Sequence, residues 1–438
     1  MPKPTPEEIE RLRAERAAKN AAKQAEAQHK PQNIIYERQW IPVSDEPGRR
    51  VRVVSWNILA QGLVRRSLFP GSDCLKVAQR IPLIAAELCK YDWDIGCFQE
   101  VDCVKDHAKA LRAAGYEYTY NKGYDSKQHG LMIAWRARNI HDAPRQCFCS
   151  PASTRVICLD DAKLNERTAG CSRLTRNIGL FAALPYAGEE GGVIVATTHL
   201  FWHPRYRYER ARQVTLLVHE LECFRNSMPQ WQSWPVIFAG DFNDQPHSPT
   251  YTLVTGKGRD YADVIDKELG DSRVIDASVD IAAGREPGTI TEGGDPDRVL
   301  DACRLPEPDD GLLYSTSELI DTCGDGLESA YGSMYKHVSG TDLYFMDRKG
   351  ATERYNDELR EPSTDPRETA SYEPKWTLYS SLFRLTLDYI FAGKTRDAYP
   401  NVTALLSLHP EQVLSERGIP KQGVCASDHI MIGAEYAF

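Results

Sequence analysis

The sequence predicts an α/β protein that folds as a four-layered sandwich, in which two mixed β-sheets pack face to face and helices lie outside. Three observations support this fold class. From about residue 50, short apolar runs alternate with longer segments of helical pattern. Hydrophobic residues make up 42% of the 438 residues, which is enough for a large buried core. Amide, carboxylate and imidazole side chains also recur where the apolar runs stop.

The apolar runs have the length of buried strands, and they predict strands at 51–58, 95–101, 131–135, 178–184, 193–200, 236–242, 387–391, 402–408 and 430–436. Between them, the segments 74–90, 102–114 and 207–224 have the pattern of helices that cover sheet faces. No internal repeat is present. One domain over 50–438 therefore accounts for most of the chain.

Two segments depart from this pattern. Residues 1–33 begin with Thr5, Pro6 and Glu8 in the order of a capped helix, and then become rich in Ala, Arg, Glu and Lys. We expect a charged N-terminal extension that is helical only marginally, because few apolar side chains are present to be buried. Residues 256–375 are dense in Gly, Pro and Asp, which predicts an insertion of mixed helix and loop.

Charge and cysteine content limit the class of protein. A net charge of −9 argues against a protein that coats nucleic acid non-specifically, so a polyanionic substrate has to be met by a local basic patch or by bound cations. The 12 cysteines include no CxxC pair, which predicts free thiols in a reducing compartment and no zinc site. Without a signal sequence or a long apolar stretch, an intracellular protein of the cytoplasm, the nucleus or both is expected, with no membrane partner.

Five polar motifs stand at the ends of predicted strands: Ser55-Trp56-Asn57, Gln99-Glu100, Thr198-His199-Leu200, Gly240-Asp241-Phe242-Asn243 and Ser427-Asp428-His429. Metal-assisted phosphodiester hydrolysis needs this combination of side chains. Glu100 is the first candidate ligand for Mg²⁺, because a carboxylate at a strand end can hold a hard cation that keeps part of its water. Asn57 either supplies a neutral oxygen to the metal or orients Glu100.

Asp241 and Asn243 alternate about Phe242. In an extended segment their side chains would share one face while the phenyl ring turns to the core. The pattern therefore predicts a base and an amide side by side, whereas a tight turn is the alternative for Gly-Asp-Phe-Asn.

The motif set resembles the endonuclease/exonuclease/phosphatase superfamily. The residues that carry the resemblance are 55–59, 97–101, 198–204, 240–243, Leu387-Asp388-Tyr389-Ile390 and 427–429, in the family's order across roughly 50–438. Within it, the chain looks like the deadenylase-like branch that includes nocturnin, Angel proteins and fungal Ngl-type RNA exonucleases, and its opening residues look like the Ngl-type N-terminus. The leucine-rich repeats of Ccr-type deadenylases do not precede the domain, so docking to that complex is not expected.

The resemblance implies a role for each site residue. Asp241 would orient or deprotonate the attacking water, and Asn243 would position that water or the scissile phosphate. Asp388 would pair with His429 and favour its imidazolium form, which can stabilise negative charge in the transition state. Asp428 would face the metal, and His199 would donate to the phosphate.

Flanking residues predict the substrate. Trp202 and Arg207 belong to a stretch after His199 that interleaves aromatic and cationic residues, a combination that stacks bases and neutralises phosphates of single-stranded RNA. The resemblance implies that Pro204 and Phe383 line a nucleobase pocket for the RNA 3′ end. Lys127 is a further phosphate-neutralising candidate, although its loop departs from the usual Lys-x-Asp-Gly by carrying His129.

The resulting hypothesis is a Mg²⁺-dependent 3′-to-5′ exoribonuclease, with Mn²⁺ as a substitute cation and one or two metals left open. Expected partners are a single-stranded RNA 3′ end and, through basic residues 11–30, a ribonucleoprotein. The alternative enzyme class is a phosphatase or phosphodiesterase on RNA end groups or a small nucleotide, for example a 2′,3′-cyclic phosphate or a 2′-phosphate, because a fold and its metal site do not fix the substrate. An RNA-binding scaffold with a dead site is disfavoured because no acidic or imidazole position is lost.

Overall fold

The computed structural model describes residues 34–139, 145–162, 164, 175–272, 274–275, 303–304, 314–338, 372–395, 398–414 and 417–438. The N-terminal extension predicted at 1–33 lies outside these residues.

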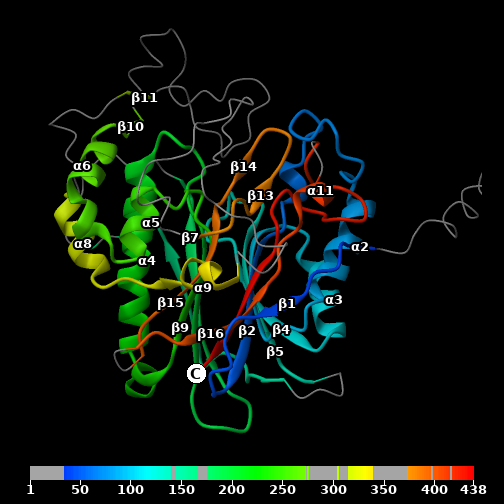
Figure 1. The fold of residues 1–438 in the computed structure, drawn as a ribbon, viewed down its shortest axis with the longest axis horizontal. Coiled ribbons are helices and arrows are strands. Elements are labelled where there is room, and N and C mark those ends of the chain that lie inside the picture. The colour runs from blue at the N-terminus through cyan, green and yellow to red at the C-terminus, as the bar shows by residue number, and fades with distance from the viewer. Residues whose placement is uncertain are drawn as a thin grey trace, which may run out of the picture.

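Two large sheets form the centre of the molecule (Figure 1). The first has seven strands in the order β1 (Trp40–Pro42), β16 (Asn401–Leu406), β17 (Ile432–Ala437), β2 (Arg50–Asn57), β3 (Ile95–Val101), β5 (Gly130–Arg136) and β4 (Tyr116–Asn121). The second has six, in the order β12 (Glu328–Ser329), β15 (Asp388–Ala392), β9 (Val236–Asp241), β8 (Gly192–His199), β7 (Ile178–Pro185) and β6 (Ser153–Cys158). Both sheets are mixed, because β2 pairs with β3 and β8 pairs with β9 in parallel while the other pairs are antiparallel.

The sheets pack against each other through β2 with β9, β3 with β8 and β5 with β7. Side chains of both sheets, such as Trp56, Ile133, Leu180 and Ile390, share one buried core. Helices α2 (Val77–Leu88) and α3 (Val104–Ala113) lie on one outer side, and α4 (Arg207–Asn226), α6 (Ala262–Gly270) and α8 (Thr316–Cys323) lie on the other (Figure 1). The predicted four-layered sandwich is confirmed.

Each predicted apolar run forms a strand, and the three predicted helices form α2, α3 and α4. The sequence did not reveal β4 and β6, which lie at the outer edges of the two sheets. Their side chains are mostly half-buried or exposed, so Tyr-Glu-Tyr-Thr-Tyr-Asn and Ser-Thr-Arg-Val-Ile-Cys lack the continuous apolar character of central strands.

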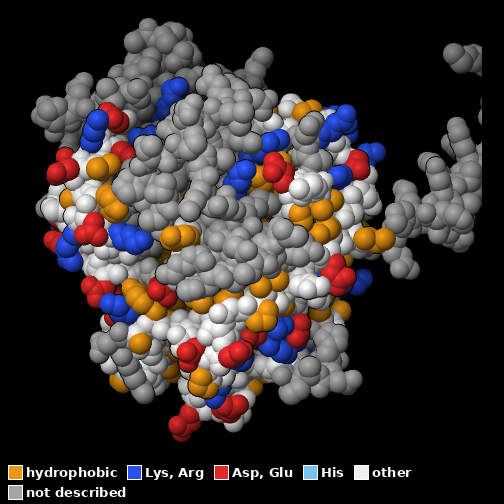
Figure 2. All heavy atoms as spheres, viewed as in Figure 1, with side chains coloured by type: hydrophobic (Ala, Val, Ile, Leu, Met, Phe, Trp, Pro, Cys, Tyr) orange, Lys and Arg blue, Asp and Glu red, His pale blue; other side chains and the backbone are white. Residues whose placement is uncertain are grey.

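Within 256–375, the described residues include α6, α8 and α9 (Ala330–Val338) and the two-stranded sheet of β10 (Val274–Ile275) and β11 (Cys303–Arg304). Helices α6 and α8 bury Ile265 and Leu319 together with Tyr208 of α4. Residues 276–302, 305–313 and 339–371 lie outside the described part of the chain, so an insertion of mixed helix and loop stays a prediction. Across the described residues, no helix has the length and apolar character that a membrane span requires. On the face in Figure 2, described Lys and Arg side chains are interspersed with acidic and hydrophobic ones.

Candidate active site

The strand ends carry the predicted motifs to one place. Strand β2 ends at Asn57, β8 ends at His199 and β9 ends at Asp241, while Glu100 is the last residue but one of β3. Since β2 and β3 are parallel, as are β8 and β9, each pair presents two carboxyl ends at one edge of its sheet. Face-to-face packing of the sheets then brings the two edges together.

Asn57 joins the sheets. Its Nδ2 donates to Glu100 Oε1 at 3.1 Å and to Asp241 Oδ2 at 3.0 Å, while its Oδ1 accepts from the Leu59 amide at 3.0 Å. Two roles were predicted for Asn57, and this geometry fits the one in which its amide orients the carboxylates. Its oxygen is turned to Leu59 and away from Glu100.

Glu100 occupies a backbone irregularity that the sequence did not reveal. The pairing of β3 with β5 shifts register between Phe98 and Val101, and Glu100 itself has φ 55°. Such bulges re-aim side chains, and a non-glycine residue in the left-handed region is often found at a functional site. Glu100 Oε2 accepts from the Ala60 amide at 2.9 Å.

The surroundings of Glu100 keep its carboxylate ionised. Burial by itself would raise the pKa of Glu100, but the rings of His199 and His129, the Ala60 amide and the Asn57 side chain together lower this pKa to about 2. Only 9% of the residue is exposed. A buried carboxylate that remains charged is suited to hold a cation.

Asp241 is buried between two histidines. Its Oδ2 lies 3.6 Å from His199 Nε2 and 3.7 Å from His429 Nε2. Burial raises the pKa of Asp241, against the opposing charge of His429. The preceding glycine is required by close strand packing, because a Cβ on Gly240 would lie 2.2 Å from the Thr198 carbonyl oxygen.

The expectation that Asp241 and Asn243 share one extended segment is wrong. Strand β9 ends at Asp241, and Asn243 adopts φ 49°. The two residues are nevertheless together, because the Asn243 amide donates to Asp241 Oδ1 at 2.9 Å. The Asn243 side chain donates to the Leu200 carbonyl at 2.9 Å, while Phe242 packs into the core as expected. A local turn therefore replaces strand alternation as the cause of their proximity.

His429 and Asp388 form the expected pair. His429 Nδ1 lies 2.9 Å from Asp388 Oδ2, which also accepts from Thr377 Oγ1 at 2.6 Å. Burial would lower the pKa of His429, but Asp388 and Asp241 outweigh it and hold this pKa well above its usual value. The shift favours the imidazolium form of His429, whose Nε2 lies 3.7 Å from Asp241 Oδ2.

His199 and Asp428 complete the group. Burial lowers the pKa of His199, against the charges of Asp241 and Glu100. Burial raises the pKa of Asp428 to about 6, with the charge of Glu100 acting in the same direction and that of His429 opposing it. Asp428 thus interacts electrostatically with both Glu100 and His429. Its role as a metal ligand stays a prediction.

Several residues that organise the site gave no signal in the sequence. Arg80 on α2 is 1% exposed and donates to the carbonyl oxygens of Ile58, Leu59 and Ala426, so it ties the loop after Asn57 to the loop before Asp428. On the second sheet, Arg210 of α4 holds the loop after His199 through the His203 carbonyl at 2.5 Å and an ion pair with Asp244 at 2.9 Å. The local sequence pattern does not predict the contacts of Arg80 or Arg210. These contacts join segments that are distant in sequence or lie on the buried side of a helix.

The donor set fits a hard divalent cation. Asp241, Asp388 and His429 place potential ligand atoms within 4.8 Å of one another, although Asp388 Oδ2 already contacts the His429 ring and Thr377. Glu100 lies next to this group, because the Asn57 nitrogen donates both to Glu100 Oε1 and to Asp241 Oδ2. Carboxylate oxygens are the ligands that Mg²⁺ prefers.

The predicted substrate residues lie around this group. Lys127 lines a surface recess together with Glu100 and His199. Trp202 is 44% exposed, and both Pro204 and Arg207 are exposed, on the loop after β8 and at the first residue of α4. Phe383, 37% exposed, lies between the hairpin strands β13 (Leu378–Tyr379) and β14 (Arg384–Leu385). Their contacts with a substrate stay predictions.

Comparisons with known proteins agree with this geometry. The sequence model described as Endonuclease/Exonuclease/phosphatase family matches residues 54–429. The chain is 26% identical to RNA exonuclease NGL2 of Saccharomyces cerevisiae over 480 residues, which covers 97% of this chain and 87% of the relative. The predicted resemblance to the branch that holds the Ngl-type, Angel and nocturnin proteins is confirmed.

Two solved structures share the fold. ANGEL2, described as a 2′,3′-cyclic phosphatase in complex with adenosine-2′,3′-vanadate, superimposes with a TM-score of 0.54 at 21% identity and covers 92% of this chain and 99% of its own. The human nocturnin catalytic domain with a bound sulfate anion gives a TM-score of 0.51 at 19% identity, covering 93% of this chain and 100% of its own.

Proposed function

Because the chain belongs to the Endonuclease/Exonuclease/phosphatase family, we propose that it is a Mg²⁺-dependent 3′-to-5′ exoribonuclease that releases nucleoside 5′-monophosphates. Family membership makes it a phosphodiester hydrolase. The observation that carries the RNA assignment is the similarity to an RNA exonuclease along 97% of the chain. The direction of attack, the metal and the products belong to the proposal.

The cation would be held by Glu100 and Asp241, and when bound it would neutralise charge on the phosphate and lower the barrier to attack. Asp241 would orient the attacking water and accept its proton, because its carboxylate is buried and fixed by Asn57 and by the Asn243 amide. His429, an imidazolium fixed by Asp388, would donate to the phosphoryl oxygen as negative charge develops. His199 would contact the same phosphate from the other side of Asp241.

The 3′-end preference rests on the exposed aromatic side chains beside the group. Phe383 and Trp202 are 37% and 44% exposed, and stacking on aromatic rings binds single-stranded bases without strict sequence selection. Together with Pro204 and Arg207, they would hold the terminal nucleotide and its phosphate.

The test uses oligo(A), oligo(U) and mixed-sequence RNA labelled at the 5′ end, with Mg²⁺, Mn²⁺ or a chelator. We expect one-nucleotide shortening from the 3′ end, resistance of a 3′-blocked RNA, and loss of activity in Glu100→Ala. Internal cleavage of the blocked RNA at equal speed would refute the exonuclease assignment.

A second candidate is removal of an RNA end group such as a 2′,3′-cyclic phosphate. It is favoured by the fold shared with a protein described as a 2′,3′-cyclic phosphatase. Product analysis separates the two, because an opened cyclic end or free phosphate without chain shortening would support this second reaction.

A further inference from the structure

Residues from both sheets line the recess beside Glu100, and most of them do not belong to the catalytic group. Its lining includes Lys122, Lys127 and His129 from the β4–β5 connection of the first sheet. The segment that leads into β7 of the second sheet supplies Arg176 and Asn177. Three cationic residues, Lys122, Lys127 and Arg176, thus line one recess, although they come from opposite sheets.

Arg176 is held in place by its backbone. It adopts φ 56°, and Asp160 fixes this conformation by accepting from the Arg176 amide at 2.7 Å and from the Thr175 amide at 2.9 Å. Non-glycine residues that are held in such a strained conformation often occur at sites that bind a ligand. The Arg176 guanidinium also donates to Ser126 Oγ at 3.2 Å, which links it to the opposite wall.

Lys122 is positioned from the other wall. Its Nζ donates to the Asp125 carbonyl at 2.9 Å, so the side chain follows its own loop. The loop passes close to β7 at Gly123, where φ is 75° and a Cβ would lie 2.3 Å from Ile178 Cγ2. Glycine is therefore required there, and it allows the two walls to approach each other. Lys122 and Arg176 are both half-buried residues of the recess lining.

The recess adjoins the reacting centre, because Glu100 and His199 are also among its lining residues. The hairpin that carries Phe383 adjoins the reacting centre on the side of His429, because Leu378 of this hairpin pairs with His429. Asp241 lies between His429 and His199. A nucleic acid strand that places its scissile phosphate at Asp241 and its terminal base at Phe383 would therefore extend its remaining chain toward the recess.

We propose that Lys122 and Arg176 form a subsite for a second phosphate, the one immediately 5′ of the scissile phosphate in RNA. This inference rests on the proposed exoribonuclease function. Arginine and lysine in a partly enclosed recess bind a phosphate through charge-assisted hydrogen bonds. The reaction itself is unchanged: water adds to the scissile phosphorus, the O3′ of the upstream nucleotide leaves with a proton, and the second phosphate stays intact.

Two dinucleotides that differ only in this phosphate provide the test. ApA carries the scissile phosphate alone, whereas pApA adds a 5′-phosphate at the position of the subsite. We expect the wild-type protein to cleave pApA with a kcat/KM about tenfold higher than that for ApA, the effect of one or two charge-assisted hydrogen bonds. In the double variant Lys122→Ala/Arg176→Ala, the ratio of the two values should fall to about one.

Matched controls separate charge from folding. The double variant Lys105→Ala/Lys109→Ala removes two exposed lysines from α3 and should keep the tenfold ratio. The conservative variant Lys122→Arg/Arg176→Lys should retain most of the ratio, because both charges remain. An unchanged ratio in Lys122→Ala/Arg176→Ala, or a wild-type protein indifferent to the 5′-phosphate, would overturn the subsite.

Failure of the subsite differs from failure of the proposed function. If longer RNA is shortened but the dinucleotide ratio does not depend on Lys122 and Arg176, only the subsite is refuted. If no RNA is cleaved, the exoribonuclease assignment is refuted as well. Selective loss of 2′-phosphate removal from a small dinucleotide in the double variant would instead assign the recess to that smaller ligand and overturn the RNA subsite.

Discussion

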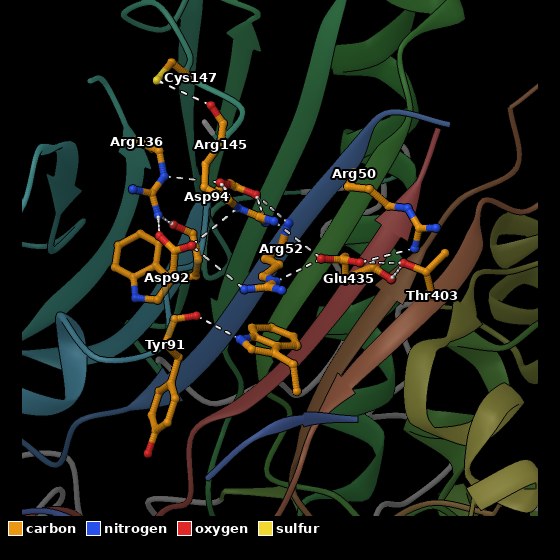
Figure 3. A network of polar contacts seen from close by, with 12 residues as sticks. Arg50, Arg52, Tyr91, Asp92, Asp94, Arg136, Arg145, Cys147, Thr403 and Glu435 are labelled. Carbon is orange, nitrogen blue, oxygen red and sulfur yellow. Dashed lines mark hydrogen bonds and ion pairs between the residues drawn. The ribbon is translucent and has the colours of Figure 1, made fainter. Parts of the chain in front are cut away.

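Two polar clusters lie at opposite ends of β2 and β3, and their acids have different partners. At the starts of these strands, Figure 3 shows a group that we name the arginine network: Arg50, Arg52, Arg136, Arg145, Asp92, Asp94 and Glu435. At the ends of the strands lie Asn57 and Glu100 of the candidate active site.

In the arginine network, each acid faces an arginine. Asp94 is fully buried and contacts Arg136 at 3.2 Å and Arg145 at 2.5 Å, while Glu435 contacts Arg52 at 2.8 Å. Burial would raise the pKa of Glu435, but Arg52, the Thr403 hydroxyl and Arg145 lower it. Buried charges that are compensated in this way belong to the structure of the protein.

In the candidate active site, the buried carboxylates instead contact an amide and histidines. Glu100 and Asp241 share a single amide nitrogen, and the imidazolium of His429 is placed between Asp241 and Asp388. The comparison shows that the two ends of these strands differ in the partners of their acids, which are arginines at the starts and an amide and titratable histidines at the ends.

The largest expected effect is on activity at Glu100. Glu100→Gln keeps the shape of the side chain but removes its charge, and we expect kcat/KM on RNA to fall by roughly 10³-fold or more. The thermal unfolding midpoint should fall moderately, because the folded protein stabilises the ionised carboxylate of Glu100, whose pKa is lowered to about 2. A variant that no longer folds would mean that this end of the strands is structural above all.

The reverse is expected at Asp94. Asp94→Ala removes the fully buried partner of Arg136 and Arg145 and leaves them with Asp92 and Glu435, which should lower the free energy of unfolding by about 3 kcal/mol. Urea unfolding measures this loss. The folded fraction should retain the wild-type kcat, so a variant that folds but is inactive would contradict the separation of the two clusters.

The Asp388–His429 pair predicts how activity depends on pH. Because Asp388 and Asp241 raise the pKa of His429, its protonated form persists above neutral pH and activity falls only as pH rises through that elevated pKa. Asp388→Asn should shift this alkaline limb to lower pH and reduce kcat by about 10²-fold at pH 8. The profile of kcat against pH is the measurement, with Asp92→Asn from the arginine network as the variant that should not move it.

The smallest effect on stability is expected for a surface ion pair between α3 and β4 of the first sheet. Arg112 and Glu117 lie 3.3 Å apart with side chains that are 58% and 48% exposed. Arg112→Ala should change the free energy of unfolding by about 0 to 1 kcal/mol, because water screens the pair. A loss as large as that of Asp94→Ala would show that burial does not set the scale of these contacts.

The central strands and the proximity of Asn57, Glu100, His199, Asp241 and His429 could be predicted from the sequence, because both follow from local signals. Continuous apolar runs mark strands buried on both faces, and polar motifs at their ends mark the edge where parallel strands meet. The edge strands β4 and β6 escaped because one face of each is open to water.

Contacts between distant segments could not be predicted in this way. The left-handed backbone at Glu100 and Asn243 could not be predicted, because neither residue is a glycine. Arg80 and Arg210 lie in helices whose sequence pattern indicates only that they cover a sheet. The recess joins loops of different sheets, so Lys122 and Arg176 become neighbours only after the sheets have packed.

Titration of the thermal unfolding midpoint with Mg²⁺ tests the central claim most directly, because an ion that binds only the folded protein stabilises it by about 2.7 kcal/mol at a hundredfold excess over its dissociation constant. We predict that the midpoint of the wild-type protein and of Asp92→Asn rises with Mg²⁺, whereas that of Glu100→Gln stays constant. An equal rise in Glu100→Gln, or no rise in the wild-type protein, would contradict the assignment of Glu100 and the neighbouring carboxylates to a metal-dependent hydrolase site.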